Sequence, residues 1–200
     1  PSRQLPTFRR GQQRLKDAIA SLKSAQVQLQ QQYTTAHMAL FKAIENENQE
    51  AIDILLEDPK LNVNQPMTIA KWTLLQVAVY NNRNDIIQLL IEKNANVNIT
   101  SRSNKSPLYI AVEYEYTDIM QTLLDAGANP NIHLKGDGFT PLHEAAESVL
   151  TDAARVLLNH NSTDIYAKDK LGWTPLEVVG MGNSKDSTEL IALLQQAGAR

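Results

Sequence analysis

One short stretch decides the fold of this chain: Phe139-Thr140-Pro141-Leu142-His143-Glu144-Ala145-Ala146. Three other stretches align with it residue by residue, and they begin at Trp72, Lys105 and Trp173. The four copies keep one leucine in register, and successive leucines lie 33, 34 and 34 residues apart (Leu75, Leu108, Leu142 and Leu176). A fainter copy from Met38 to Ala43 lies 35 residues before the first of these. A period of this size indicates a solenoid of stacked units.

Each copy is followed, eight residues after its alanine, by a second apolar cluster. The clusters occupy residues 51–56, 86–91, 119–124 and 153–158. Their apolar residues fall at i, i+1, i+3 and i+4, which marks one face of a helix. Thr or Ser suits the N-cap of the preceding helix, and Pro suits its first position. The pattern therefore predicts units of two helices, the second of which closes at Asn94 or Gly127, residues that tolerate a left-handed conformation.

A period near 33 residues combined with Thr-Pro-Leu-His-x-Ala resembles the ankyrin repeat. The resemblance covers residues 34–200 and implies an all-α solenoid of about five helix-turn-helix repeats with short β-hairpin fingers. The predicted repeats are 34–66, 67–100, 101–134, 135–168 and 169–200. The first lacks the Thr-Pro pair, as a capping repeat often does. The turn between the two helices carries Asn82, Glu115 and Val149 where the family usually has Gly, and the last repeat has about three extra residues within 181–186.

The segment before the repeats has a different pattern. Residues 1–10 read as an extended tail, whose start lacks both an initiator Met and an apolar signal core. Residues 11–33 predict an amphipathic helix with an apolar stripe of heptad character that includes Leu15, Ile19 and Leu22. Two interpretations compete for this helix: a cap folded on the first repeat, or a coiled coil that dimerises an otherwise monomeric chain. The natural protein is expected to be longer than this chain.

Composition narrows the functional classes. The 200 residues carry a net charge of −3, which does not suggest an electrostatic nucleic-acid binder, and they include no cysteine. No apolar run approaches the roughly 18 residues that a membrane span needs. The four histidines lack metal-ligand spacing, and no phosphate-binding or dinucleotide-binding glycine pattern occurs. The sequence predicts no enzyme within this chain, no cofactor, no metal and no contact with nucleic acid or membrane.

Partners of ankyrin repeats usually dock on the concave surface that the finger tips and the inner helices form. The resemblance therefore implies three sets of partner-binding residues. The first precedes the Thr or Ser of each motif: His37, Trp72, Lys105, Phe139 and Trp173. The second ends the inner helices: Glu45, Asn46, Tyr80, Asn81, Glu113, Tyr114, Glu147 and Ser148. The third occupies finger tips: Arg102, Ser103, Asp137, Lys170 and Leu171.

Both tryptophans of the chain fall in the first set, with Phe139 between them. Large aromatic side chains on a concave surface are typical of binding hot spots, but packing of each ring on the next finger explains them equally well. The polar residues around them have mixed charge, which favours a protein or peptide partner over a polyanion. Asn64, Asn98 and Asn131 lie at the end of the approach to the hairpins, eight residues after Leu56, Leu90 and Leu123, in a context that resembles asparaginyl hydroxylation sites of ankyrin repeats; stabilisation of a turn is the alternative.

Three functions remain open at this stage. The chain is an adaptor or scaffold module that binds one partner protein, or a regulatory or substrate-recruiting segment of a larger enzyme. A narrower hypothesis is an effector that an intracellular bacterium secretes into its host, because the Asn- and Gln-rich, cysteine-free repeats resemble such proteins. The absence of cysteine fits a reducing compartment. We therefore expect a cytoplasmic protein, in the host cytosol under the effector hypothesis, with the nucleus left open.

Overall fold

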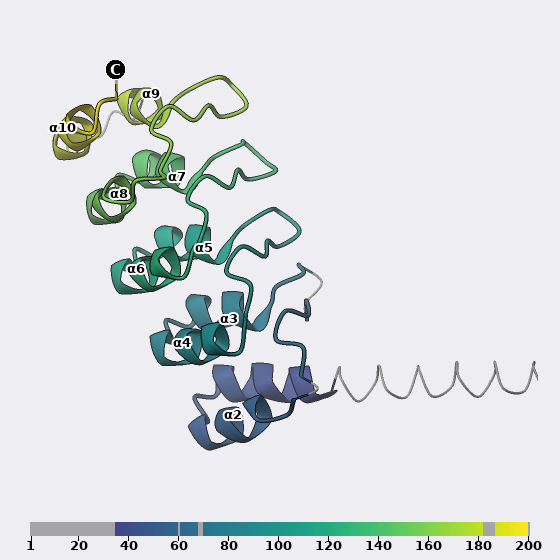
Figure 1. Cartoon of the computed structure of the whole chain (residues 1–200). Coiled ribbons are helices and arrows are strands. Elements are labelled where there is room, and N and C mark those ends of the chain that lie inside the picture. The colour runs from purple at the N-terminus through teal and green to yellow at the C-terminus, as the bar shows by residue number, and fades with distance from the viewer. Residues whose placement is uncertain (1–34, 60, 68–69, 182–186, 200) are drawn as a thin grey trace, which may run out of the picture.

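The structure is a computed structural model that describes residues 35–59, 61–67, 70–181 and 187–199. Helices stack in two layers along one axis, and loops that we call fingers project from one side of the stack (Figure 1). The described part contains no strand. This confirms an all-α solenoid of helical repeats. The expected tail at 1–10, the expected helix at 11–33 and the insertion at 182–186 lie outside the described residues.

The inner layer consists of the helices that begin at the repeated motif. Residues 35–45 are helical in the first repeat. The following inner helices are α3 (Leu74–Tyr80), α5 (Pro107–Glu113), α7 (Pro141–Glu147) and α9 (Pro175–Met181). The side chains of Thr73, Ser106 and Thr140 accept a hydrogen bond from the third backbone N–H of their helices, as the N-cap prediction requires. A proline occupies the first position of α5 and α7, where its missing N–H costs nothing.

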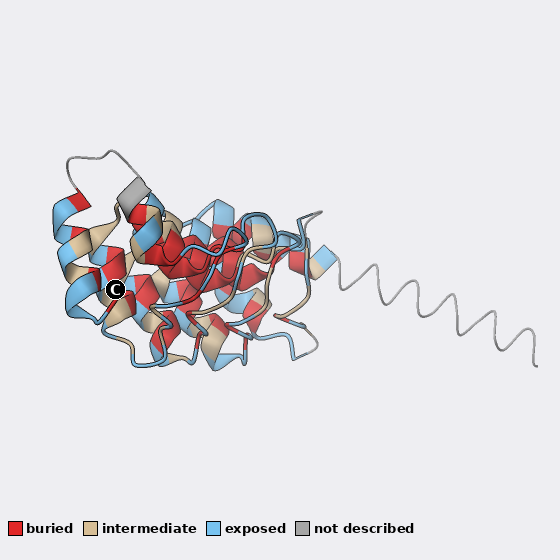
Figure 2. Ribbon diagram, turned by 90° about the horizontal axis from the view of Figure 1, so that it is seen from above, coloured by how far each residue is buried: buried red, intermediate tan, exposed pale blue. Residues whose placement is uncertain are grey.

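The outer layer packs against the inner one and buries the second apolar clusters. Its helices are α2 (Gln49–Leu56), α4 (Asn84–Glu92), α6 (Thr117–Asp125), α8 (Thr151–Leu158) and α10 (Thr188–Gln196). Each inner helix contacts the inner helix of the next repeat, and each outer helix from α4 onward contacts the next outer helix. Buried residues line the facing sides of both layers, as Figure 2 shows. Ala145 and Ala146 are fully buried in α7, so these small side chains let neighbouring inner helices approach closely.

The fingers are hairpin-shaped, but they contain no β-ladder within the described residues, which corrects the expectation of β-hairpins. One backbone hydrogen bond closes each finger at its base; in the fourth repeat it joins Leu134 N to Phe139 O at 2.8 Å. Backbone bonds also connect the tips of successive fingers, from Arg102 N to Ala70 O at 2.8 Å and from Lys170 N to Asp137 O at 2.8 Å. The fingers therefore form a row held by contacts between tips rather than by strand pairing.

The turns between paired helices contain a residue with a left-handed backbone at the position where the family usually has glycine. The dihedral angle φ is +55° at Asn82, +54° at Glu115 and +56° at Val149. Asparagine tolerates this region, whereas glutamate and β-branched valine are strained there. The closing residues of the outer helices behave as predicted, with φ of +61° at Asn94 and +87° at Gly127.

Candidate protein-binding surface

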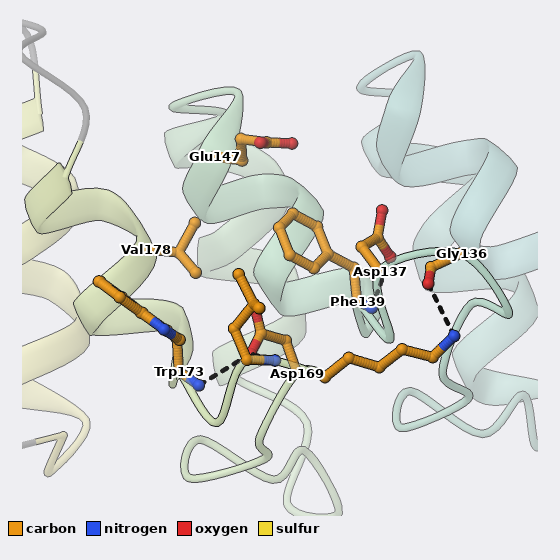
Figure 3. A pocket seen from close by; sticks show the side chains of 9 residues that line it. Gly136, Asp137, Phe139, Glu147, Asp169, Trp173 and Val178 are labelled. Carbon is orange, nitrogen blue, oxygen red and sulfur yellow. Dashed lines mark hydrogen bonds between the residues drawn. The ribbon is translucent and has the colours of Figure 1, made fainter.

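A groove of about 690 Å³ opens between the fourth and fifth repeats on the side of the fingers. Its walls come from two fingers and from the inner helices α7 and α9: Gly136, Asp137, Phe139, Glu147, Asp169, Lys170, Leu171, Trp173 and Val178. Figure 3 shows the Phe139 ring in the middle, Trp173 and Val178 on one side, Asp137 on the other and Glu147 above it. Five residues predicted for the concave surface, together with the finger-tip residue Leu171, thus line one cavity.

Local turns hold the groove in shape. The Asp169 carboxylate accepts hydrogen bonds from the backbone N–H groups of Leu171 and Trp173, both at 2.8 Å. The Asp137 carboxylate accepts from Phe139 N at 2.8 Å. Aspartates that bond to nearby backbone fix such loops without further packing. As a result, Leu171 stays 81% exposed and Trp173 36% exposed, while Phe139 is buried and stacks on His143 at a centroid distance of 5.4 Å.

The electrostatics of the groove are dominated by carboxylates. Partial burial raises the pKa of Glu147, and the neighbouring charges of Glu144 and Asp137 raise it further. No cation contacts Glu147 among the described residues. The Lys170 ammonium does not serve this role, because it donates to the backbone carbonyls of Lys135 and Gly136. The rim above the apolar walls is therefore acidic and unneutralised.

The second and third repeats carry a different cluster on the same surface. The Trp72 ring meets Tyr80 edge-on at 5.5 Å, Tyr80 meets Tyr114 edge-on at 5.3 Å, and Tyr114 stacks on Tyr116 at 5.7 Å. Tyr80 and Tyr114 are about half exposed, at 47% and 46%. Trp72 is partly buried and packs against the core. Trp72 and Phe139 thus pack inward, whereas Trp173 remains exposed.

Two predicted site residues of the third repeat neutralise each other. The Lys105 ammonium lies 2.5 Å from a Glu113 carboxylate oxygen and 5.8 Å from the centroid of the Tyr109 ring. Both side chains of the ion pair are about a quarter exposed. The position that holds a cation in the third repeat holds Phe139 in the fourth, and Glu113 corresponds to Glu147. The two repeats therefore carry a carboxylate at the same position. In the third repeat it is paired with an ammonium group, and in the fourth it has no salt-bridge partner among the described residues.

Buried polar side chains connect each repeat to the next. The buried His143 ring bonds through Nδ1 to Thr140 Oγ1 at 2.8 Å and through Nε2 to Trp173 O at 2.9 Å. The second bond crosses to the fifth repeat and so joins two neighbouring units. Burial lowers the pKa of His143, because the charged ring would lose hydration.

Gln76 replaces the histidine in the second repeat and makes the same pair of contacts. Its Oε1 accepts from Thr73 N at 2.9 Å, and its Nε2 donates to Lys105 O at 2.8 Å. The asparagines in the loops that follow the outer helices also bridge repeats: Asn131 donates to Ser162 O at 2.7 Å and accepts from Asp164 N at 2.9 Å. Asn64 and Asn98 make the equivalent bonds, so their role extends beyond a local turn.

The remaining predicted residues are spread over the surface. Glu45, Asn81 and Arg102 are exposed, but they do not line the groove. The placement of His37 on the concave surface is wrong: it is 2% exposed, and its Nε2 lies 2.8 Å from Asn62 O. The reason is that the helix of the first repeat already includes residues 35–45, so position 37 lies within a helix and not at the base of a finger.

Sequence reasoning did not select Val178, Asp169 or Tyr116. Asp169 had a signal, because an aspartate three residues before Gly172 is typical of a tight loop. Tyr116 lies in the turn before α6, and only the neighbouring Tyr114 ring shows its relevance. Among the described residues, no group of His, Asp and Glu is arranged to hold a metal. No helix in that part of the chain is both long and apolar enough to cross a membrane.

A family profile matches nearly the whole chain, and two known proteins match parts of it. A family profile of ankyrin repeats (3 copies) matches residues 12–101, 40–133 and 108–199. The tyrosine-protein kinase HTK16 of Hydra vulgaris is 28% identical over 142 residues, which cover 70% of this chain and 18% of the kinase. The putative ankyrin repeat protein FPV024 of fowlpox virus (strain NVSL) is 29% identical over 109 residues, which cover 54% of this chain and 18% of that protein. The chain thus spans less than a fifth of either relative, and the profile, the period and the stacked helix pairs establish that it belongs to the ankyrin repeat family.

Proposed function

We propose that this chain is a binding module without catalysis of its own that holds a partner protein on its concave surface, as an adaptor or scaffold in the cytoplasm. Ankyrin repeats generally mediate interactions between proteins. The observation that carries the proposal is the groove between the fourth and fifth repeats, where Trp173 and Leu171 stay exposed beside buried Phe139. Exposed aromatic and aliphatic side chains next to polar groups are typical of protein-binding hot spots.

The groove favours a partner with an apolar anchor. Tight local turns hold Leu171 and Trp173 in place before any partner binds, so little conformational entropy is lost on association. The aromatic cluster at Tyr80 and Tyr114 extends the same surface toward the second and third repeats. A partner that covers both regions would contact several consecutive fingers.

Site-specific crosslinking tests this proposal. A photoreactive phenylalanine analogue replaces Leu171 in the groove, and in a control chain it replaces Ile54, which is 64% exposed on the outer helix α2. We expect a discrete protein adduct from position 171 that disappears when Trp173→Ala is added, and none from position 54. Adducts at position 54 alone, or adducts at 171 that ignore Trp173, would place binding elsewhere. Trp72 is left unchanged because it packs against the core.

A second candidate function rests on one comparison. A tyrosine-protein kinase shares the similarity over 18% of its length, which favours a regulatory or substrate-recruiting segment within a larger enzyme. The sequence of the full-length natural protein distinguishes the two. A catalytic domain on the same chain would support the recruiting role, and its absence would support the adaptor. The hypothesis of a bacterial effector is tested by the same sequence and its source.

A further inference from the structure

The comparison of two neighbouring repeats suggests what the groove binds. In the third repeat, Lys105 and Glu113 occupy the position before the motif and the end of the inner helix, and they form an ion pair at 2.5 Å. In the fourth repeat, Phe139 and Glu147 occupy the same two positions, eight residues apart in both cases. The fourth repeat thus keeps the carboxylate and lacks the cation that neutralises it one repeat earlier.

Nothing within the described part of the chain replaces that cation. Glu147 has no salt-bridge partner there, and the ammonium groups of two lysines in the fourth and fifth repeats are engaged elsewhere. Lys170 donates to backbone carbonyls of the preceding finger, and Lys168 pairs with Glu177 at 3.3 Å. Asp137 and Glu144 add negative charge near Glu147. A carboxylate in such surroundings is stabilised by a cation that arrives from outside.

The apolar part of the groove determines the second feature of the ligand. The exposed Trp173 side chain and Val178 form a wall beside Phe139 and below Glu147 (Figure 3), and the exposed Leu171 lines the same groove. An aliphatic or aromatic side chain of the ligand can pack against this wall while a neighbouring cation of the ligand reaches Glu147 across the Phe139 ring. Such a cation also gains from the ring face, as the Lys105 ammonium does above Tyr109.

We propose that the groove binds a segment of a partner protein in which a lysine or arginine lies next to a large apolar residue, the cation pairing with Glu147 and the apolar side chain packing on Leu171 and Trp173. The proposal rests on the proposed function and specifies the partner that the groove selects. Under this proposal Glu147 selects a positive charge on the ligand, and Trp173 provides the apolar contact. The Lys105–Glu113 pair shows that this carboxylate position accepts an ammonium group in this fold.

A phage-displayed library of random dodecapeptides tests the proposal on the whole chain. We expect peptides enriched on the wild-type chain to carry Lys or Arg beside an aromatic or large aliphatic residue. On Glu147→Gln the basic residue should lose its enrichment, and the affinity of a synthetic wild-type-selected peptide should fall about tenfold, the usual size for one hydrogen bond to a charged group. Glu92→Gln, at an exposed position of the outer helix α4, is the matched control and should change neither result.

Phe139→Lys provides an independent test, because it recreates the Lys–Glu pair of the third repeat inside the groove. We expect it to abolish the basic preference while its far-ultraviolet circular dichroism stays that of the wild type. If that variant fails to fold, Glu147→Gln alone decides the question. Enrichment of acidic or uncharged peptides, or an unchanged affinity in Glu147→Gln, would overturn the inference, and so would the absence of any enriched peptide. These outcomes leave the crosslinking at position 171 unaffected, so they are distinguishable from a failure of the proposed function.

Discussion

His143 makes the stability of the array sensitive to pH, and the chain itself supplies the variant that removes this sensitivity. The buried ring accepts from Thr140 through Nδ1 and donates through Nε2 to the Trp173 carbonyl. Gln76 offers an acceptor and a donor in the same arrangement two motifs earlier. His143→Gln should therefore preserve both contacts and lose only the ability to bind a proton.

The sign and size of the effect follow from linkage. Burial lowers the pKa of His143 in the folded chain below the ordinary value of about 6.5 that applies when the chain is unfolded. Above that value the ring is neutral in both states and contributes no pH dependence. As the pH falls below about 6.5, the unfolded chain binds the proton first, so the free energy of unfolding decreases by up to about 1.4 kcal/mol per pH unit. At pH 5 the loss is therefore at most about 2 kcal/mol.

Urea denaturation followed by circular dichroism at pH 7.5 and pH 5 measures this difference. We expect the wild type to lose more stability than His143→Gln between the two values, with equal slopes in urea. His143→Ala is the control, and it should be less stable than His143→Gln by about 2 to 3 kcal/mol at both pH values because Trp173 O and Thr140 N lose a buried partner. An identical pH dependence in the wild type and in His143→Gln would refute the assignment of the proton to this ring.

Two pairs of variants test the left-handed backbone of the turns between helices and the hydrogen bonds between repeats. Glu115→Gly should stabilise the chain by about 0.5 to 1 kcal/mol because glycine relieves an exposed residue held at φ +54°, whereas Asn82→Gly should gain less, since asparagine already tolerates this region; equal gains in thermal denaturation would contradict the strain argument. Asn131→Ala should destabilise by about 1 to 3 kcal/mol because it removes two bonds to the fourth repeat, and Asn129→Ala should cost less because its side chain accepts a bond from Asn131 N within its own repeat. If urea denaturation shows the same loss of stability in both alanine variants, the bonds of Asn131 between repeats stabilise the chain no more than a local bond does.

The periodic motif made the stack predictable, because helix caps, first-turn prolines and apolar spacing are local signals that survive without knowledge of the neighbours. The same reasoning placed Asp137, Phe139, Glu147, Lys170, Leu171 and Trp173 on one surface, and the structure brings them into one groove. It failed at His37, because the motif had degenerated there and the helix starts earlier than the alignment implied. The sequence also did not predict that the described parts of the fingers lack β-pairing. The bonds that hold the finger tips join residues of different repeats, which a single motif does not reveal.

Contacts between side chains, within a repeat and across repeats, were the least predictable part of the surface. The sequence shows that Lys105 and Glu113 stand eight residues apart, but only the fold shows that their charged groups touch. Likewise, Tyr80 and Tyr114 belong to different repeats, and nothing in either motif predicts the edge-on contact of their rings. Pairings of this kind depend on the rotation between units, which a repeated motif does not encode.

The groove straddles the junction between the fourth and fifth repeats, and this position has a thermodynamic consequence. In a linear array, stability is the sum of the units and of the couplings between neighbours. A ligand seated across one junction adds its binding free energy to that coupling, so it ties the fifth unit to the four before it. Occupancy would then slow the local opening of the fifth unit, and amide protons of α9 and α10 would exchange more slowly without any change in their structure.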